Sequence, residues 1–271
     1  MDNGSLAPAA TLCLREAAAR LGAALRQPVE AVSLLHSNAI PPDQLAGIPA
    51  ETLEAALKHR LKDGRSDFLV VPFFFGPSRA LSDYLPARVG QLKAEHPQLR
   101  VRVAPPLVDL NSPQDERIAA ILEDRVRSAM RHCSAPPAVM LVDHGSPTRN
   151  VTEVRNHVAL QLKARLGPDV QQVLAASMER RPGADYAFNE PLLESALGQA
   201  EFARGTVIVA LLFLASGRHA GPDGDIARIC QEAERRHSQL RILITEPLGS
   251  HPALTPILAE RVQAGLARDP L

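Results

Sequence analysis

Two histidines in the second half of the chain have the surroundings that metal or acid–base chemistry needs. His144 follows an apolar run within Asp143-His144-Gly145-Ser146, and His219 follows another within Ser216-Gly217-Arg218-His219. Neutral imidazoles suit borderline divalent ions such as cobalt, nickel or ferrous iron, and they also accept protons near neutral pH. Because the neighbouring glycines and small residues let a flat ligand approach the backbone, the two histidines predict a site for metal binding or for proton removal.

Charged side chains follow the same apolar segments. Glu179 is a candidate oxygen ligand or proton acceptor, and four arginines are candidates for pairing with the carboxylates of an acidic substrate. These arginines are Arg149, Arg180, Arg181 and Arg218. Glycine-rich turns after strands also bind phosphate in many folds, but the chain has neither the dinucleotide-binding nor the P-loop fingerprint. A single His-Gly-Ser sequence is a weak signal, so the prediction depends on both histidines together.

The elements that must position these side chains are strands of a parallel sheet. Apolar runs alternate with segments of helical periodicity and lie at residues 138–142, 170–176, 206–214 and 240–244. Strands that are apolar throughout and alternate with helices indicate a parallel sheet covered on both faces. Ligands of such sheets bind beyond the carboxyl ends of the strands. We therefore expect the imidazoles of His144 and His219 to converge at one edge of the sheet.

The first half of the chain repeats the second. At an offset of 141 residues (143 − 2), residues 2–5 match residues 143–146, and the apolar helix face from Val151 to Leu166 matches one from Ala10 to Leu25. Later landmarks also align: Arg79 with Arg218, and Pro106-Leu107 with Pro247-Leu248. The repeat predicts an α/β protein with two tandem lobes and parallel sheets, residues 1–134 and 135–271, divided near two prolines.

Only the second lobe keeps the candidate site residues. Asn3 stands where the second lobe has His144, and Ala80 (219 − 139) stands where it has His219. At the same offset of 141, Ser37-Asn38 stand in place of Met178-Glu179. The sequence therefore predicts that any chemistry is carried out by the second lobe.

Composition and cysteine usage exclude several classes of protein. Lys and Arg together number 30 and are balanced by 30 Asp and Glu, and aromatic residues make up 3% without any Trp. A nucleic-acid clamp would show a basic excess and stacking aromatics. No apolar run approaches the roughly 20 residues of a membrane span, and because no basic start is followed by an apolar stretch we expect no secretory signal. The three cysteines are far apart and read as core residues of a protein in the reducing cytoplasm.

The beginning of the chain departs from the repeat. In the second lobe, Asp143 is preceded by the apolar run 138–142, whereas in the first lobe Asp2 is preceded only by Met1. Two explanations are open: an upstream segment of four to six apolar residues, which we favour, or a sheet rebuilt with fewer strands. Either predicts that residues 1–5 are irregular and that the first sheet has one strand fewer than the second.

The strand-end motifs resemble the class II tetrapyrrole chelatases, the sirohydrochlorin cobaltochelatase and ferrochelatase family of CbiX and SirB type. The resemblance rests on residues 143–146, on residues 213–219 followed by Asp225-Ile226, and on residues 247–252. The resemblance covers the whole second half of the chain, and the first half resembles the family as a degenerate copy. In long members of the family we would expect the first half to carry the site, so this chain departs from the pattern.

The resemblance implies two chelatase-like, flavodoxin-like α/β/α lobes that face a cleft and insert a divalent metal ion into a tetrapyrrole without ATP. It implies that His144 and His219 hold the metal ion and accept the pyrrole protons, and that Glu179 assists. Sirohydrochlorin carries many carboxylates, which the arginines would bind together with small residues of the turns: Gly145, Ser146 and Gly217. The metal, Co2+, Fe2+ or Ni2+, would be a substrate, and no cofactor would be bound permanently.

Three functions remain open at this point. The first is an active chelatase in siroheme or cobalamin synthesis, with no nucleic-acid or membrane partner. The second is a non-catalytic metal- or tetrapyrrole-binding protein on the same scaffold. The third is a small-molecule binding module that uses the cleft between the lobes. The paired histidines favour the first two, and the internal duplication is compatible with a monomer or with a homodimer.

Overall fold

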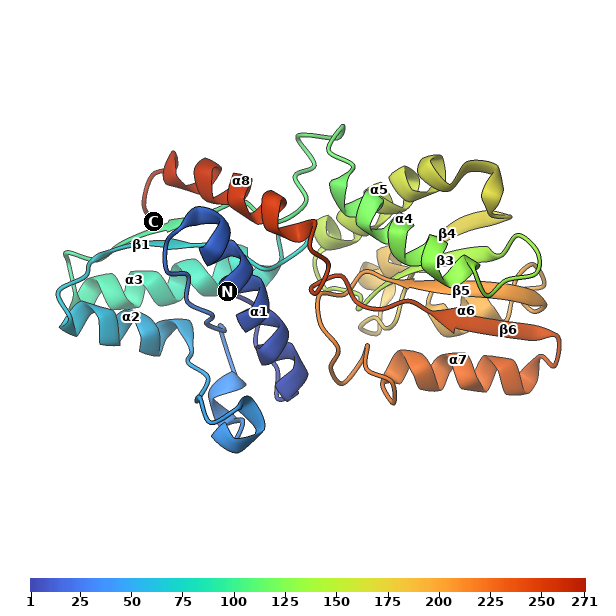
Figure 1. Cartoon of the computed structure of the whole chain (residues 1–271), viewed down its shortest axis with the longest axis horizontal. Helices are drawn as coiled ribbons and strands as arrows, with labels where there is room; N and C mark the ends of the chain where they lie inside the picture. Colours follow the sequence, from blue (N-terminus) through green and yellow to red (C-terminus); the bar gives the residue numbers. More distant parts are fainter. The chain divides into compact units, whose positions relative to one another are not determined.

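The computed structural model describes all residues, 1–271, and the chain forms two compact units (Figure 1). The first unit consists of Met1–Asp109 and Pro252–Leu271, and the second of Leu110–His251. No helix is long and apolar enough to cross a membrane. Each unit is a parallel sheet with helices packed against it, as the alternation of apolar runs and helical segments predicts.

The second unit contains a four-stranded parallel sheet with the order β4-β3-β5-β6. Its strands are β3 (Ala138–Asp143), β4 (Gln172–Ser177), β5 (Gly205–Leu211) and β6 (Leu240–Ile244). Its helices are α4 (Arg117–Met130), α5 (Arg149–Leu166), α6 (Leu193–Leu197) and α7 (Asp225–Arg236), with the short 3-10 turns η4 (Gly167–Asp169) and η5 (Ala184–Asn189). All four predicted strands are present within three residues of their expected ends. The first strand, β3, lies in the interior of the sheet.

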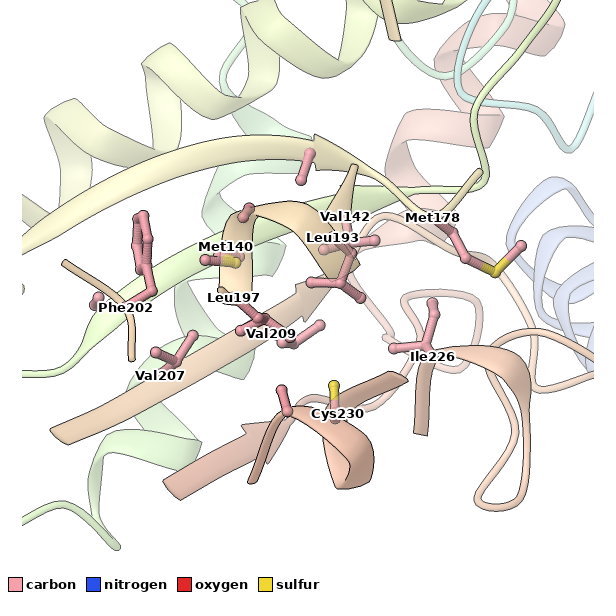
Figure 2. Close-up of a cluster of buried hydrophobic side chains, with 14 of the residues drawn as sticks. Met140, Val142, Met178, Leu193, Leu197, Phe202, Val207, Val209, Ile226 and Cys230 are labelled. Atoms are coloured by element: carbon pink, nitrogen blue, oxygen red, sulfur yellow. The ribbon is translucent and has the colours of Figure 1, made fainter. Parts of the chain in front are cut away.

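The core of this sheet follows from the alternation of side chains along its strands. Met140 and Val142 of β3 point to one face, where they pack with Leu197 of α6 and with Ile226 and Cys230 of α7 (Figure 2). Because successive side chains of a strand point to opposite faces, Val139 and Leu141 point to the other face, against which α5 packs. Every residue from Ala138 to Asp143 is buried, which explains why this strand reads as a continuous apolar run.

The first unit contains a two-stranded parallel sheet of β1 (Asp67–Val70) and β2 (Arg100–Val103). Its α-helices are α1 (Pro8–Leu25), α2 (Leu53–Lys62), α3 (Leu85–Glu95) and α8 (Leu254–Leu266). Shorter helical turns are η1 (Ser37–Ala39), η2 (Pro42–Leu45) and the π-helical η3 (Ala80–Tyr84). Val29, which corresponds to Val170 at the offset of 141, lies in irregular structure. An apolar cavity of about 390 Å³ lies beside β1, lined by α1, α8 and residues 27–32.

The internal repeat is visible in the backbone hydrogen bonds of the two units. Phe73 N donates to Met1 O in the first unit, as Leu212 N donates to Val142 O in the second. Likewise Leu107 N donates to Phe74 O, as Leu248 N donates to Phe213 O. The offsets of these pairs are 139 and 141 residues, which are the offsets that the sequence predicts. The duplication is therefore confirmed at the level of single hydrogen bonds.

The units as packed differ from the predicted division into residues 1–134 and 135–271. Helix α4 belongs by sequence to the first repeat, yet it packs on α5 and β5 of the second unit. Helix α8 belongs by sequence to the second repeat, yet it packs on α1, β1 and β2 of the first (Figure 1). The last helix of each repeat thus completes the other unit, because two copies of one fold offer equivalent faces to an apolar helix.

The first five residues are irregular, as predicted, apart from one isolated bridge between Asp2 and Ser33. The prediction that the first sheet has one strand fewer than the second is wrong, because the sheets have two and four strands. The counterpart of β4 is also missing as a strand, since Ser33 forms only isolated bridges, to Asp2 and to Thr52.

Candidate active site

The two histidines of interest follow neighbouring strands. His144 comes directly after β3, and β5 leads into the loop that carries His219. The chain leaves β3 toward β4 on one side and later returns to β5 on the other, so the strand order reverses between β3 and β5. In open α/β sheets the crevice at such a point, beyond the carboxyl ends of the strands, is where ligands bind.

The imidazole rings of His144 and His219 lie against each other, as the sequence predicts. Their centroids are 4.6 Å apart and their planes are inclined at 76°. Glu179 Oε1 lies 3.5 Å from His144 Nε2. The side chains of His144 and Glu179 are 46% and 60% exposed, and that of His219 is 29% exposed. Two imidazoles and a carboxylate therefore meet at an accessible edge of the sheet.

Each of the two imidazole rings is oriented by a hydrogen bond at its Nδ1 atom. His219 Nδ1 lies 2.6 Å from Asp225 Oδ2, and His144 Nδ1 lies 3.0 Å from Gly145 O. Since a carbonyl oxygen only accepts, Nδ1 of His144 carries the proton. Both rings thereby keep Nε2 as the free lone pair, which is the atom that binds a metal ion or accepts a proton.

Asp225 at the start of α7 is a site residue to which the sequence assigned no role. The hydrogen bond from His219, together with Arg228, holds the pKa of Asp225 below its usual range although partial desolvation opposes this. The carboxylate is therefore ionised and fixes the orientation of the His219 ring. The sequence signal was its place in the strand-end motif, six residues after His219.

Replacing Asp225 by Asn is expected to weaken metal binding at the histidine pair by about tenfold, because a carboxylate partner that orients a ligating histidine contributes about this much. Titration of the purified variant with Co2+, followed by visible absorption, measures the effect. Arg228→Gln is the matched control, since it removes the other hydrogen-bond partner of Asp225 and leaves the contact with His219. Equal affinities in wild type and Asp225→Asn would show that Asp225 does not position the ring.

A tight turn brings Glu179 to His144. Glu179 N donates to His144 O at 3.1 Å, and Met178 N donates to Asp143 O at 2.8 Å, so the pairing of β3 with β4 continues past the strand ends. Gly145 has φ +89°, and a Cβ at this position would lie 1.9 Å from Glu179 O. Only glycine fits this approach, which explains the Gly of the His-Gly-Ser sequence.

The four candidate arginines have different surroundings. Arg180 is already bound, since its Nε donates to Glu190 Oε1 at 2.6 Å and its Nη1 donates to the carbonyls of Arg181 and Gly183. The guanidinium groups of Arg149 and Arg181 lie 4.9 and 5.9 Å from the rings of Phe188 and Tyr186. Arg218 is 82% exposed and lies 3.9 Å from Asp225. Arg149, Arg181 and Arg218 therefore have polar groups accessible to an anionic ligand.

The small candidate residues hold the turns together, mainly through backbone hydrogen bonds. Ser146 N and O bond to the side-chain amide of Asn189 at 2.9 Å each, and Ser146 Oγ accepts from Thr148 N at 3.0 Å. Gly217 O accepts a hydrogen bond from Gly221 N at 2.9 Å, which closes the turn around His219. Ser146, Gly145 and Gly217 thus shape the turns that carry the histidines.

The side chains at this site provide only some of the ligands that a divalent metal ion needs. No group of three or more His, Cys, Asp or Glu side chains in the chain is arranged to hold a metal ion. Two nitrogen ligands would leave most coordination positions of a divalent ion to water or to an incoming ligand, as in catalytic sites rather than closed structural ones.

The first unit lacks all three groups of the site. Asn3 and Ala80 occupy the positions of His144 and His219. The predicted match of Ser37-Asn38 to Met178-Glu179 is wrong, because Leu34 N donates to Asp2 O and Leu35 N donates to Asn3 O. Leu35 is thus the counterpart of Glu179. The segment from Asp2 to Ser33 is three residues shorter than its counterpart from Asp143 to Ser177, since 33 − 2 is 31 and 177 − 143 is 34, and this shifts the register at Leu35. The loop that follows is four residues longer in the first unit, since 52 − 33 is 19 and 192 − 177 is 15, so the offset returns almost to 141 and the shift is hidden in the sequence.

Comparison with known proteins agrees with this description. The sequence model of the CbiX family matches the chain twice, over residues 2–129 and 138–264. A search of curated proteins finds no match. Among solved structures, the chain is similar to SirB from Bacillus subtilis with Fe3+, at 18% identity and a TM-score of 0.69 over 98% of this chain and 93% of that chain.

Two further structures are similar over nearly the whole chain. One is the sirohydrochlorin chelatase SirB from Bacillus subtilis subspecies spizizenii in complex with cobalt, at 17% identity and a TM-score of 0.65 over 97% of this chain and 91% of that chain. The other is CbiX, described as the terminal enzyme for biosynthesis of siroheme in denitrifying bacteria, at 18% identity and a TM-score of 0.58 over 95% of this chain and 93% of that chain. At these identities the structures show a shared fold.

Proposed function

Because this chain belongs to the CbiX family of class II chelatases, we propose that its second unit inserts a divalent metal ion, Co2+ or Fe2+, into sirohydrochlorin or a related acidic tetrapyrrole without ATP. The observation that carries the proposal is the pair of facing imidazoles of His144 and His219, 4.6 Å apart. The relatives described as sirohydrochlorin chelatase and as the terminal enzyme of siroheme synthesis support the same substrate.

The proposed chemistry replaces two pyrrole protons by one metal ion. The Nε2 atoms of His144 and His219 bind the metal ion and strip part of its water, and the macrocycle nitrogens take the remaining positions. As the metal ion moves into the macrocycle, its bonds to the two Nε2 atoms break, bonds to the macrocycle nitrogens form, and two pyrrole N–H bonds break. The two freed Nε2 atoms accept these protons, for which imidazole is suited near neutral pH, and Glu179, 3.5 Å from His144 Nε2 and exposed, passes them to solvent. Ni2+ is an alternative substrate, since imidazole discriminates weakly among these ions.

Substrate carboxylates are assigned to the arginines whose polar groups are accessible. We propose that Arg149, Arg181 and Arg218 bind them, and that Arg180, which is bound to Glu190, shapes the loop. Gly145, Ser146 and Gly217 provide backbone that a flat macrocycle can approach. The reaction would take place in the cytoplasm, in siroheme or cobalamin synthesis, with no nucleic acid or membrane as partner, and the protein would act as a monomer or a homodimer.

The decisive experiment mixes the purified protein with sirohydrochlorin and Co2+ or Fe2+ in the absence of ATP and follows the absorbance of the macrocycle. Insertion faster than in a protein-free control supports a chelatase. Binding of metal and tetrapyrrole without acceleration indicates the non-catalytic alternative, and no binding of either would leave a small-molecule module.

Acidic tetrapyrroles are expected to bind at least about tenfold more tightly than protoporphyrin, because several exposed arginine–carboxylate pairs of up to about 1 kcal/mol each add together. Rising salt should reduce this preference, since exposed ion pairs are screened. Equilibrium titration of both macrocycles at low and high salt measures it. Equal affinity for both macrocycles would contradict the assignment.

A further inference from the structure

A buried polar layer lies beneath the turn that carries His144. It consists of Asp143, Arg155, Ser177 and Asn189, each at most 6% exposed. Burying such groups costs free energy unless they bond to one another, and apolar side chains often stabilise an interior as well or better. The layer therefore calls for an explanation other than stability.

Arg155 of α5 is the centre of this layer. Its side chain is 2% exposed, and Nη1 lies 3.8 Å from Asp143 Oδ1. Nη1 donates to Ser177 Oγ at 2.5 Å and to Asn189 O at 2.9 Å. Nε and Nη2 both donate to Asn156 Oδ1, at 3.0 and 2.9 Å. One guanidinium thus joins the end of β4 to the end of η5.

Both segments that Arg155 joins hold the turn of residues 143–146. Ser177 Oγ donates to Asp143 Oδ1 at 2.6 Å, and the same oxygen accepts from Gly145 N at 3.1 Å. Asn189 binds Ser146 through both ends of its amide, at 2.9 Å. The backbone is therefore fixed on both sides of His144, and every fixing residue contacts Arg155.

The first unit serves as an internal comparison. It retains the Asp2–Ser33 hydrogen bond and the bond from Gly4 N to Asp2 Oδ1 at 3.1 Å. At the offset of 141, the counterpart of Arg155 is Leu14, a core residue that is 4% exposed. The turn there carries Asn3 in place of a histidine. The same turn therefore forms without a guanidinium, and the guanidinium occurs in the unit where the turn carries an imidazole.

We propose that Arg155 is a positioning residue, which through Ser177 and Asn189 holds the imidazole of His144 in its place against His219. The inference deepens the proposed function, because it concerns the geometry of the same site. The positioning itself does not require that the protein be a chelatase.

The test compares Arg155→Met and Arg155→Lys with Leu162→Ala, a change at a fully buried residue on the same helix that does not reach the turn. Two readouts are used: affinity for Co2+ alone, from visible absorption, and the NMR signal of the His144 ring without metal, assigned through its loss in His144→Ala. Arg155→Met is expected to lose about tenfold or more in Co2+ affinity and to shift the His144 signal. Arg155→Lys keeps the charge and part of the bonding, so its loss should be smaller.

Leu162→Ala is expected to lower the melting temperature while it leaves both readouts unchanged. If Arg155→Met does not fold, Arg155→Lys decides by the same two readouts. Arginine variants that match Leu162→Ala in both the Co2+ affinity and the His144 signal would overturn the inference. A wild-type protein that inserts no metal, with a His144 signal that still depends on Arg155, would overturn the proposed function and support the positioning role.

Discussion

Replacing either His144 or His219 by alanine is expected to abolish metal insertion, with a loss of at least about a hundredfold in rate, the range for removing a residue that transfers protons in the transition state. A single imidazole provides only one of the two nitrogen ligands and can accept only one of the two pyrrole protons. Both side chains are partly exposed beyond strand ends, so the unfolding free energy should change by no more than about 0.5 kcal/mol.

Insertion of Co2+ into sirohydrochlorin, followed by absorbance, and thermal unfolding of the same samples measure this prediction. His237→Ala is the matched control. His237 lies between α7 and the amino end of β6, whereas the two site histidines follow the carboxyl ends of their strands. The His237→Ala variant should retain wild-type turnover. Near-normal turnover in either His144→Ala or His219→Ala would refute the proposed roles.

The second large effect is expected from Gly145→Ala. The added Cβ would lie 1.9 Å from Glu179 O, and φ is +89° at this position, so the turn must move at a cost of about 1–3 kcal/mol. The movement displaces His144 from His219 and from Glu179. Because displacements of about 1 Å can reduce rates a hundredfold, we expect loss of insertion and of Co2+ affinity.

Gly4→Ala is the control for this change. Gly4 has φ +90°, and its Cβ would lie 1.6 Å from Leu35 O, so the same strain arises in a unit without the histidines. It should lower the melting temperature to a similar extent and leave Co2+ affinity unchanged. The interpretation of the turn fails if Gly145→Ala binds Co2+ as tightly as Gly4→Ala does.

Much of the second unit could be predicted from local patterns. The run Ala138–Val142 is apolar at every position, and a strand covered on both faces requires this, so β3 and its place in a parallel sheet were predictable. Ligands bind beyond the carboxyl ends of such strands, so the sequence alone predicts that His144 and His219 lie together.

The partners of the histidines were less accessible to sequence reasoning. Asp225 lies on the helix after the His219 loop, and only the folded turn brings its carboxylate to Nδ1. Arg155 did leave a signal, because it is a charged residue beside the apolar helix face of Val154 and Val158. Its partners come from two later segments, however, and the spacing of residues on one helix does not reveal them.

The sequence by itself determined the repeat, the parallel strands of the second half and the edge at which the two imidazoles meet, because these depend on apolar periodicity and on the order of elements. Tertiary structure alone decided that Leu35 and not Asn38 is the counterpart of Glu179, since loop length hides the register that backbone hydrogen bonds set. It also decided that α4 and α8 each complete the unit of the other repeat. The apolar face of a helix requires that the helix pack against a sheet, but the two copies of the sheet offer equivalent packing surfaces.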